Sequence, residues 1–327
     1  AAGQALYPWT LRTLLGGRPV ALQPAGAVVA EAYLRGVSTR KVEALVQSMG
    51  ISSLSKSEVS RLCASLDAQV TAFRTRRLDA EYPYLCLDAR YEHVREDERV
   101  QSMAVVIAYG IRADGVREVL AIDVTTSESL VHWREFLQGL VARGVRGVKL
   151  VTSDAHAGLK QAIAEVFLGA GWQRCRVHFL RNLLLRVPKN LQAMVAATVR
   201  PIFHQGSRQE AQSQLRQVCA TLGARFPKVV ELLVGAEEDI FAFYDFPKEH
   251  WRQIYSTNPL ERVNKELKRR SAVVGIFPNR ASVLRLLGAL LAEQNDEWLV
   301  GRHYFSEASM RKLSQPQAEA ELELATA

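Results

Sequence analysis

The 327-residue sequence lacks the features that mark several large classes of protein. Its four cysteines are too few and too scattered for a disulfide framework, so a reducing compartment is expected: Cys63, Cys86, Cys175 and Cys219. No apolar run reaches the roughly 18 residues that a membrane helix needs. The N-terminus also lacks the basic-then-apolar pattern of a signal peptide. Together these absences predict a cytoplasmic protein.

Several well-known catalytic motifs are missing as well. The sequence contains no phosphate-binding glycine loop, no HExxH motif and no paired CxxC motifs. A nucleotide-driven motor and a zinc peptidase are therefore both unsupported. Hydrophobic residues make up 48% and charged residues 23% of the chain, an ordinary balance that argues against disorder or a coiled coil and favours globular domains.

Positive charge is in excess and is concentrated in two segments. Lys and Arg number 42 against 34 Asp and Glu, for a net charge of +8. Seven basic residues and one acid lie from Arg262 to Arg285, and five basic residues and no acid lie from Arg174 to Lys189. Such clustering suits a surface that follows phosphates better than scattered charge does, which favours DNA as a partner.

The N-terminal region is predicted to be helical. Helices are expected over Ala27–Leu34, from Ser38 to Met49, and from Ser55 onward, where Glu58 completes a capping box. This order is that of a helix-turn-helix, although a generic small helical bundle fits the segment equally well. In a helix-turn-helix, Lys56 and Arg61 on the third helix would reach phosphates or base edges.

The pattern changes to strands from about residue 82. Strands are expected over Tyr84–Asp88, Val100–Tyr109 and Val116–Val124, with turns at Gly110 and at Asp114–Gly115. Three successive strands joined by short turns indicate an antiparallel meander. The next helix is predicted over Ser129–Val141, and its helical spacing predicts these buried residues: Trp133, Phe136, Leu137, Leu140 and Val141.

Strands and helices then alternate. Strands are expected over Val148–Thr152 and Trp172–Val177, with a helix over Leu159–Phe167 between them. The pattern indicates an α/β fold with a mixed sheet, of which the ribonuclease-H-like type is one of several topologies. The predicted division is a helical DNA-binding region (1–80), a catalytic core (81–178 and 251–308), a helical insertion (179–250) and a tail (309–327). The core's last helices are expected near Pro259–Arg270 and Ala281–Trp298.

Carboxylates at strand ends are the first candidate site residues. Asp88 is expected to close the first strand and Asp154 to follow the fourth. Groups at neighbouring strand ends converge on one crevice in an open α/β sheet, and two carboxylates can share Mg²⁺ there. The alternative is that each Asp caps a turn or the following helix, because Asp is favoured in turns for its own hydrogen bonding.

A third carboxylate lies in the helix near Pro259–Arg270. Glu261, Lys265 and Lys268 are spaced i, i+4, i+7 and so share one face, which suits a metal-bound phosphate steadied by lysines. Glu266 points about 140° away from Glu261, so both cannot face one metal site. The alternative is a solvated helix held by a Glu–Lys pair.

Three stretches together resemble the bacterial Mutator-type insertion-sequence transposases, a group of DDE transposases. They are Tyr84–Tyr91 (YLCLDARY), Ser153–Leu159 (SDAHAGL) with Trp172–His178 (WQRCRVH), and Phe246–Arg270. The last carries His-Trp, Ser-Thr-Asn and Glu-Arg-x-Asn-x-Glu-x-x-Arg-Arg, as in the family signature. The motifs agree in order and spacing, and the resemblance covers roughly Leu34 to Trp298, although family members usually carry more chain ahead of the helix-turn-helix.

The resemblance implies a ribonuclease-H-like core split by a helical insertion, with Asp88, Asp154 and Glu261 as a metal-binding catalytic triad. It implies two Mg²⁺ ions, for which Mn²⁺ substitutes, and no nucleotide cofactor. Cys175 and His178 fit the family's Cys-x-x-His element. By chemistry alone this pair is at most half a zinc site, and the alternative is a buried Cys with a hydrogen-bonded His at a strand–helix junction.

The function expected from these observations is DNA transposition by strand cleavage and strand transfer. Its partners would be the element's terminal inverted repeats and target DNA, with a homodimer or larger assembly on the nucleoid. A domesticated non-catalytic DNA-binding regulator and a structure-specific nuclease are the alternatives. The candidate DNA-binding residues are Lys56, Arg61, Arg174, Arg176, Arg181, Arg262, Lys265, Lys268, Arg269 and Arg270.

Overall fold

The computed structural model of the protein describes residues 56–314, and the side chains of 64–258, 260 and 262–313. The helices predicted over residues 27–49 and the side chains of Lys56 and Arg61 lie outside the described residues, so the helix-turn-helix stays a prediction. Among the described helices, none combines the length and the apolar character that a bilayer-spanning segment needs.

The described residues form one mixed six-stranded sheet, which confirms the predicted α/β class. Its strand order is β3-β2-β1-β4-β5, with β6 paired to the far end of β1. The first three strands are antiparallel, as the meander predicts, and β1, β4 and β5 run parallel. The strands are β1 (Tyr84–Glu96), β2 (Arg99–Ile111), β3 (Arg117–Thr125), β4 (Leu150–Ser153), β5 (Gly171–Arg174) and β6 (Ile276–Phe277).

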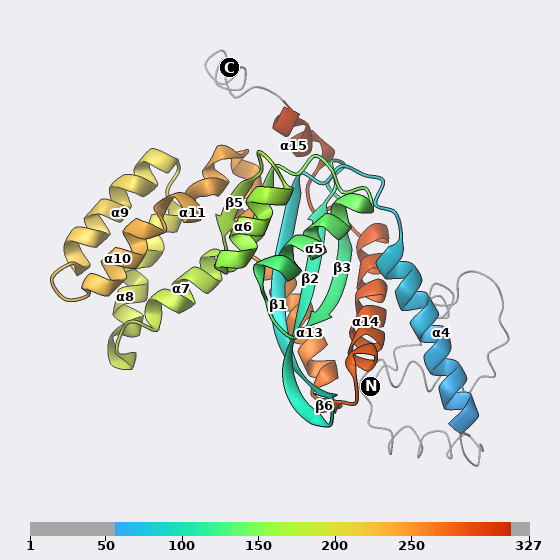
Figure 1. Ribbon diagram of the computed structural model, residues 1–327. Coiled ribbons are helices and arrows are strands. Elements are labelled where there is room, and N and C mark those ends of the chain that lie inside the picture. Colours follow the sequence, from blue (N-terminus) through green and yellow to red (C-terminus); the bar gives the residue numbers. More distant parts are fainter. Residues whose placement is uncertain (1–55, 315–327) are drawn as a thin grey trace, which may run out of the picture.

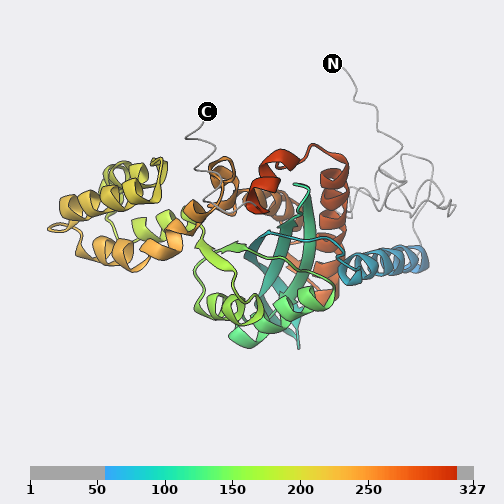
Figure 2. The same ribbon diagram turned by 90° about the horizontal axis from the view of Figure 1, so that it is seen from above.

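Helices cover both faces of the sheet and extend beyond its two edges (Figures 1 and 2). They are α4 (Lys56–Thr75), α5 (Leu130–Ala142), α6 (Ala157–Val166), α7 (Arg176–Leu184), α8 (Gln192–Val199), α9 (Arg208–Leu222), α10 (Pro227–Gly235), α11 (Glu237–Phe241), α12 (Trp251–Ile254), α13 (Asn258–Ser271), α14 (Arg280–Val300) and α15 (Glu307–Arg311). Short 3₁₀ turns cover Lys189–Leu191, Arg200–His204, Ala242–Asp245, Lys248–His250 and Lys312–Ser314. In Figure 1, α7 leads away from the β5 edge to α8–α11, and α4 lies on the opposite side.

The alternation of side chains along β1 separates two cores. Leu85 and Leu87 point into a cluster with Trp133 of α5 and Ile163 of α6. Tyr84 and Cys86 point into the opposite cluster, which includes residues of α13 and α14. Since side chains two apart share a face, Asp88 lies on the α13 side of the sheet.

The structure corrects the predicted end of the first strand. Asp88 lies in the middle of β1, which pairs with β2 along its whole length, from Tyr84↔Ile111 to Glu96↔Arg99. Beyond residue 90, only alternate side chains such as Glu92 and Val94 are buried, because one face of this half is exposed. The continuous apolar run on which the prediction rested therefore stops well before the strand does.

Gly110 is a strand residue and not a turn residue. It pairs with Glu118 within the sheet, and a Cβ there would lie 2.7 Å from Tyr82 Cδ1 and 2.9 Å from Leu120 Cδ1. Close packing explains this glycine, whereas the turn predicted at Asp114–Gly115 is confirmed, with Gly115 at φ +85°.

Smaller differences concern helix boundaries and burial. In α5, Trp133, Leu137 and Leu140 are buried as predicted, but Val141 is 44% exposed and Phe136 is only half-buried, so the apolar face is narrower than the spacing suggests. Val177, predicted to end a strand, lies in the first turn of α7 because β5 stops at Arg174. The strand β6 and the helix α15 were not predicted, and both are short.

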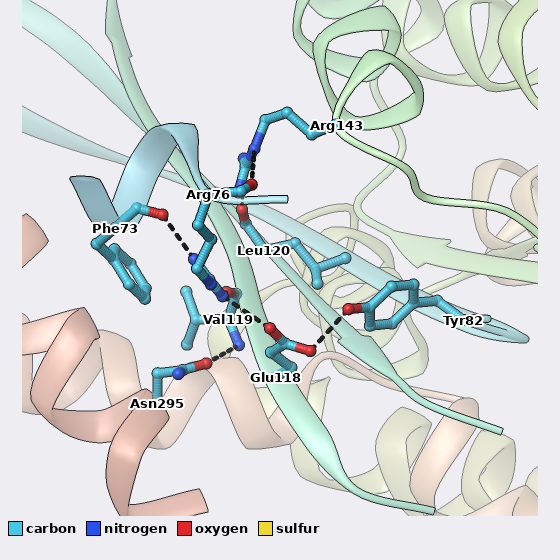
Figure 3. Close-up of polar contacts among 8 residues, drawn as sticks. All are labelled: Phe73, Arg76, Tyr82, Glu118, Val119, Leu120, Arg143 and Asn295. Atoms are coloured by element: carbon cyan, nitrogen blue, oxygen red, sulfur yellow. Dashed lines mark hydrogen bonds and ion pairs between the residues drawn. The ribbon is translucent and has the colours of Figure 1, made fainter. Parts of the chain in front are cut away.

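A polar network joins the end of α4 to the sheet (Figure 3). The Glu118 carboxylate on β3 accepts hydrogen bonds from Tyr82 Oη at 2.7 Å and from Arg76 Nη2 at 3.0 Å. Arg143, just after α5, donates to the carbonyls of Arg76 and Leu120 at 2.9 and 2.8 Å. The half-buried charges thus fix the chain between α4 and β1.

The helices α4 and α14 approach closely. A Cβ on Gly288 would lie 2.6 Å from Val70 Cγ1, so only glycine permits this approach. One turn away, Arg285 donates two hydrogen bonds to the Asp67 carboxylate, at 2.8 and 2.7 Å. The C-terminal half of α4 is therefore part of the core.

Candidate active site

Asp88 on β1 and Asp154, the residue directly after β4, lie at the same level of the sheet. The β1–β4 register pairs Tyr84 with Leu150 and Cys86 with Thr152. Asp88 and Asp154 are each two residues beyond the last of these pairs, and adjacent strands are about 4.8 Å apart. The register therefore brings the two carboxylates to one place, where β4 ends and leaves the edge of β1 open.

Asp88 is only 8% exposed and faces α13. Its Oδ2 accepts a hydrogen bond of 2.6 Å from Asn264 Nδ2. Asn264 is three residues after Glu261, so the two lie on neighbouring parts of one helix face. Although the Glu261 side chain is outside the described residues, its backbone position is one turn from the residue that contacts Asp88.

Asp154 begins the turn between β4 and α6. Its Oδ1 accepts a hydrogen bond of 2.7 Å from the Ala155 backbone N–H, so the turn function weighed in the sequence analysis is present. His156 then caps α6, with Nδ1 accepting from Leu159 N at 3.3 Å. A local turn and a place beside Asp88 are compatible roles for the same carboxylate.

An arginine on β1 holds the far half of α13. Arg90 is half-buried and forms an ion pair with the buried Glu92. It also donates to the Asn264 carbonyl at 3.3 Å and to Ser271 Oγ at 3.2 Å. Burial lowers the pKa of Arg90, whereas the charges of Glu92 and Asp88 oppose that change. These contacts hold α13, and with it Asn264, at a fixed position relative to β1.

Cys175 ties the start of α13 to the residue before Asp154. It is fully buried at the N-terminus of α7, and its backbone N–H donates to the Ser153 carbonyl at 2.7 Å. Its Sγ accepts from the Thr257 backbone N–H and contacts Thr257 Oγ1, both at 3.3 Å. One residue thus joins the ends of β4 and β5 to the helix that carries Glu261.

His178 lies one turn further along α7 and interacts with Cys175 and both aspartates. Its pKa is raised to about 9 by the hydrogen bond to Cys175, with further contributions from the charges of Asp154 and Asp88. Burial alone would raise the pKa of the Cys175 thiol, but the hydrogen bond and charge of His178 lower it below its usual value. Cys175 and His178 are thus a buried Cys and a hydrogen-bonded His at a strand–helix junction.

The basic candidates differ in their surroundings. Arg262, Lys265 and Lys268 are exposed on α13. Arg269 and Arg270 instead donate to Glu266, at 2.9 and 2.7 Å, and these hydrogen bonds lower the pKa of Glu266 to about 2. Glu266 is therefore engaged in a surface pair on α13.

The basic residues at the end of β5 and on α7 are partly inside the protein. Arg176 donates to Tyr255 Oη at 2.9 Å and stacks on the same ring, with its Cζ 3.7 Å from the ring centroid. Arg174 lies 4.9 Å from the Phe179 ring, and burial lowers its pKa. Arg181 on α7 is exposed and has an interaction partner. The cluster thus contributes to packing between β5, α7 and α12.

The chemistry of the donors fits Mg²⁺. The carboxylates of Asp88 and Asp154 are hard oxygen ligands, and Asn264 orients one of them. Among the side chains that the structure describes, no three His, Cys, Asp or Glu residues are grouped to hold a metal. Glu261, whose side chain lies outside the described residues, is on the helix that contacts Asp88.

Sequence reasoning missed three residues that organise this site: Asn264, Thr257 and Arg90. Thr257 belongs to the Ser-Thr-Asn motif, from which only helix capping is expected, and Asn264 belongs to the Glu-Arg-x-Asn motif, so a signal was present but did not predict that either residue holds the acids. Arg90 follows Asp88 by two residues in a long strand and carried no separate signal.

Comparison with known proteins places the chain in a family. The model of the Mutator family of transposases matches residues 14–301. The chain is 48% identical over 292 residues to the transposase for insertion sequence element IS1081 of Mycobacterium tuberculosis. The aligned segment covers 89% of this chain and 70% of the relative. It is 44% identical over 287 residues to the IS406 transposase of Burkholderia multivorans (87% and 74%). It is 39% identical over 277 residues to the transposase for IS256 in transposon Tn4001 of Staphylococcus aureus (84% and 70%). The chain belongs to the Mutator family of transposases.

Proposed function

We propose that the protein cuts and rejoins DNA at the ends of an insertion element, by Mg²⁺-dependent phosphoryl transfer with Asp88, Asp154 and Glu261 as the catalytic triad. One observation carries the proposal: the β1–β4 register, continued one residue past the end of β4, sets Asp154 beside Asp88, and Asp88 contacts the helix that bears Glu261. The family membership of the chain supports the same reaction.

The proposed core is of the ribonuclease-H-like type. Three antiparallel strands followed by parallel strands, with helices on both faces, support this assignment. The all-helical segment from α7 to α11 enters after β5 and returns at α12, as an insertion into that core would. The region before α4, together with Lys56 and Arg61, is proposed to hold the element's ends.

In this proposal Asp88, Asp154 and Glu261 hold two Mg²⁺ ions, which when bound activate the attacking oxygen and stabilise the leaving oxygen. Water attacks a phosphodiester at an element end, and the P–O3′ bond breaks to give a 3′-hydroxyl and a 5′-phosphate. That hydroxyl then attacks a phosphodiester of target DNA, forms the new P–O bond and displaces the 3′-oxygen of the target strand as a hydroxyl. Asn264 orients Asp88, and Cys175 fixes the start of α13 against β4. Lys265 and Lys268, exposed on α13, steady the DNA backbone.

The test is a strand-transfer assay with the purified full chain, a pair of element ends, target plasmid and Mg²⁺ or Mn²⁺. Asp88→Asn, Asp154→Asn and Glu261→Gln should each abolish cutting and joining while end binding stays within about threefold. Asp239→Asn is the matched control, because Asp239 forms a surface ion pair with Lys160 on α6.

Three other outcomes would contradict the proposed function or the triad. Tight end binding by the wild type without any cutting would make the chain a regulator. Cutting of branched DNA without joining of ends would make it a structure-specific nuclease. Full activity in the Asp88→Asn or Asp154→Asn variant would remove the triad from the mechanism.

A further inference from the structure

A cleft of about 480 Å³ lies beside the first turns of α13. It is lined by three arginines from three separate elements: Arg117 of β3, Arg252 of α12 and Arg262 of α13. Side-chain amides, Val263 and the rings of Trp298 and Tyr304 complete the lining, and no carboxylate is among the lining residues whose side chains the structure describes. Arg262 is two residues, or about 200° of helical rotation, from Asn264, so the cleft is on the side of α13 away from Asp88.

The arginines of the cleft differ from those nearby. Arg269 and Arg270, on the same helix, are neutralised by Glu266. In the part of the chain that the structure describes, Arg117, Arg252 and Arg262 have no such carboxylate partner, and Arg252 and Arg262 are exposed. Three positive charges around one hollow create a field that attracts an anion.

Arg117 is fixed in place at the inner end of the cleft. Its guanidinium carbon lies 4.4 Å from the ring centroids of both Trp298 and Tyr304, so two aromatic faces hold it. Burial lowers the pKa of Arg117, and the nearby charge of Arg262 lowers it further. A bound phosphate would relieve that repulsion between the two arginines.

We infer that this cleft binds one unpaired nucleotide of a DNA strand, with its phosphate on the arginines and its base against the aromatic rings. The volume is in the range of small-molecule pockets and fits a single nucleotide. Arginine beside aromatic rings is a usual combination for single-stranded DNA, because bases stack on rings while guanidinium groups bind phosphate. The cleft is a second site, on the side of α13 away from Asp88.

The shape of the site favours a single strand over a duplex. A duplex presents its phosphates on a convex surface, which suits exposed residues such as Lys265 and Lys268 on α13. Arg117 is half-buried between two rings, and only a flexible strand with a base turned out of the helix reaches it. This inference rests on the proposed action on DNA, but not on the cutting chemistry.

The experiment measures binding of a fluorescent mixed-sequence oligonucleotide, single-stranded or duplex, to the full chain in EDTA. Arg252→Ala and Arg262→Ala, both at exposed positions, should each weaken single-strand binding about tenfold and reduce the salt slope by about 0.7. Duplex affinity should change less than twofold. Arg216→Ala, which removes an exposed arginine on α9, is the control for net charge and should leave both affinities unchanged.

A second measurement locates the base. Irradiation of the complex with an oligonucleotide containing 4-thiothymidine should crosslink the wild type at Trp298 or Tyr304, and Arg262→Ala should reduce that crosslink. Unchanged single-strand affinity, an equal loss for duplex, or crosslinks only elsewhere would overturn the inference. Displacement by inorganic phosphate at equal ionic strength would also overturn it, because the cleft would then be a plain anion site.

These results are independent of the proposed reaction. If the wild type never cuts DNA but shows the crosslink and the single-strand preference, the cleft inference stands and the proposed reaction fails. If the wild type cuts and joins ends while the cleft variants bind single strands normally, only the cleft inference fails.

Discussion

Asn264 donates a 2.6 Å hydrogen bond to Asp88 across the gap between α13 and the centre of β1. These residues are 176 positions apart in the chain, and the whole helical segment from α7 to α11 lies between them. The bond joins β1, which precedes the helical segment in the chain, to α13, which follows it. The position of Asp88 therefore depends on the packing of α13.

Asn264→Asp should remove this hydrogen bond and replace it with repulsion between carboxylates. We expect strand-transfer activity to fall at least 100-fold, because Asp88 would move from its position or bind a proton. Single-turnover assays at saturating DNA measure this effect. Asn190→Asp, the same change at an exposed position, should leave activity unchanged. Near-normal activity of Asn264→Asp would show that the bond does not position Asp88.

Cys175→Ala should loosen the start of α13. The buried Thr257 backbone N–H would lose its acceptor, which costs about 1–3 kcal/mol of unfolding free energy. Activity at saturating DNA should fall more than DNA affinity, because Glu261 loses its position and not its charge. Cys175→Ser keeps an acceptor and should recover most of the rate. Equal rates for Cys175→Ala and the wild type would limit Cys175 to a packing role.

Much of this arrangement could be predicted from the sequence, and the reasons for the rest are physical. The meander, the alternating strands and helices and the helix with Glu261 follow from hydrophobic periodicity, which is a local property. The length of β1 does not, because its second half is buried on one face only and its apolar run ends at Leu87. Pairing of that half with β2 and β6 is a tertiary effect.

The candidate acids could be predicted, but the residues that hold them could not. Asp88 and Asp154 stand out as acids next to apolar runs. Asn264 and Thr257 belong to sequence motifs, but their roles become evident only when α13 is placed over β1 and α7, because the role of a polar side chain depends on its hydrogen-bond partner. Gly110 shows a different error. Glycine is common in turns and so predicts one here, but Gly110 lies in β2, where close packing leaves no space for a larger side chain.

Glu261 and Glu266 should respond differently to neutral substitution. Glu261→Gln should abolish cutting. Glu266→Gln should retain at least a third of the activity, since it breaks only exposed pairs with Arg269 and Arg270, which contribute about 0.5 kcal/mol or less each. Cutting of end DNA by each variant in Mg²⁺ tests the assignment, which would be reversed if Glu266→Gln were the inactive protein.

The Glu118 network should matter for stability rather than for catalysis. Glu118→Ala leaves the partly buried Arg76 and the buried Tyr82 without their carboxylate, and we expect a loss of about 3 kcal/mol in unfolding free energy. Urea denaturation measures it. Glu307→Ala, which breaks an exposed pair with Arg311, should cost less than about 0.5 kcal/mol. Similar losses for the two variants would contradict the structural role.

Stability should fall in mild acid through His250. This residue is fully buried and contacts Tyr84 Oη through Nδ1 at 2.7 Å, and burial lowers its pKa from 6.5 to about 4. The unfolded chain therefore binds a proton more readily than the folded chain. The contribution of His250 is complete above about pH 6.5 and is lost progressively down to pH 4, a difference on the order of 3 kcal/mol.

His250→Gln should flatten this part of the stability profile, while His303→Gln, at an exposed position, should leave the slope unchanged. Denaturation series between pH 4 and pH 7 give the slopes. A wild-type slope that persists in His250→Gln would assign the acid sensitivity to other groups.

The most direct test of the triad is a change of metal preference. Asp154→Cys replaces a hard oxygen ligand by sulfur, which binds Mg²⁺ poorly and Mn²⁺ better. In a cutting assay on element ends, the variant should be inactive in Mg²⁺ and regain measurable activity in Mn²⁺, while Asp239→Cys should behave like the wild type in both. Full activity of Asp154→Cys in Mg²⁺ would contradict a metal-binding role for Asp154 and, with it, the proposed mechanism.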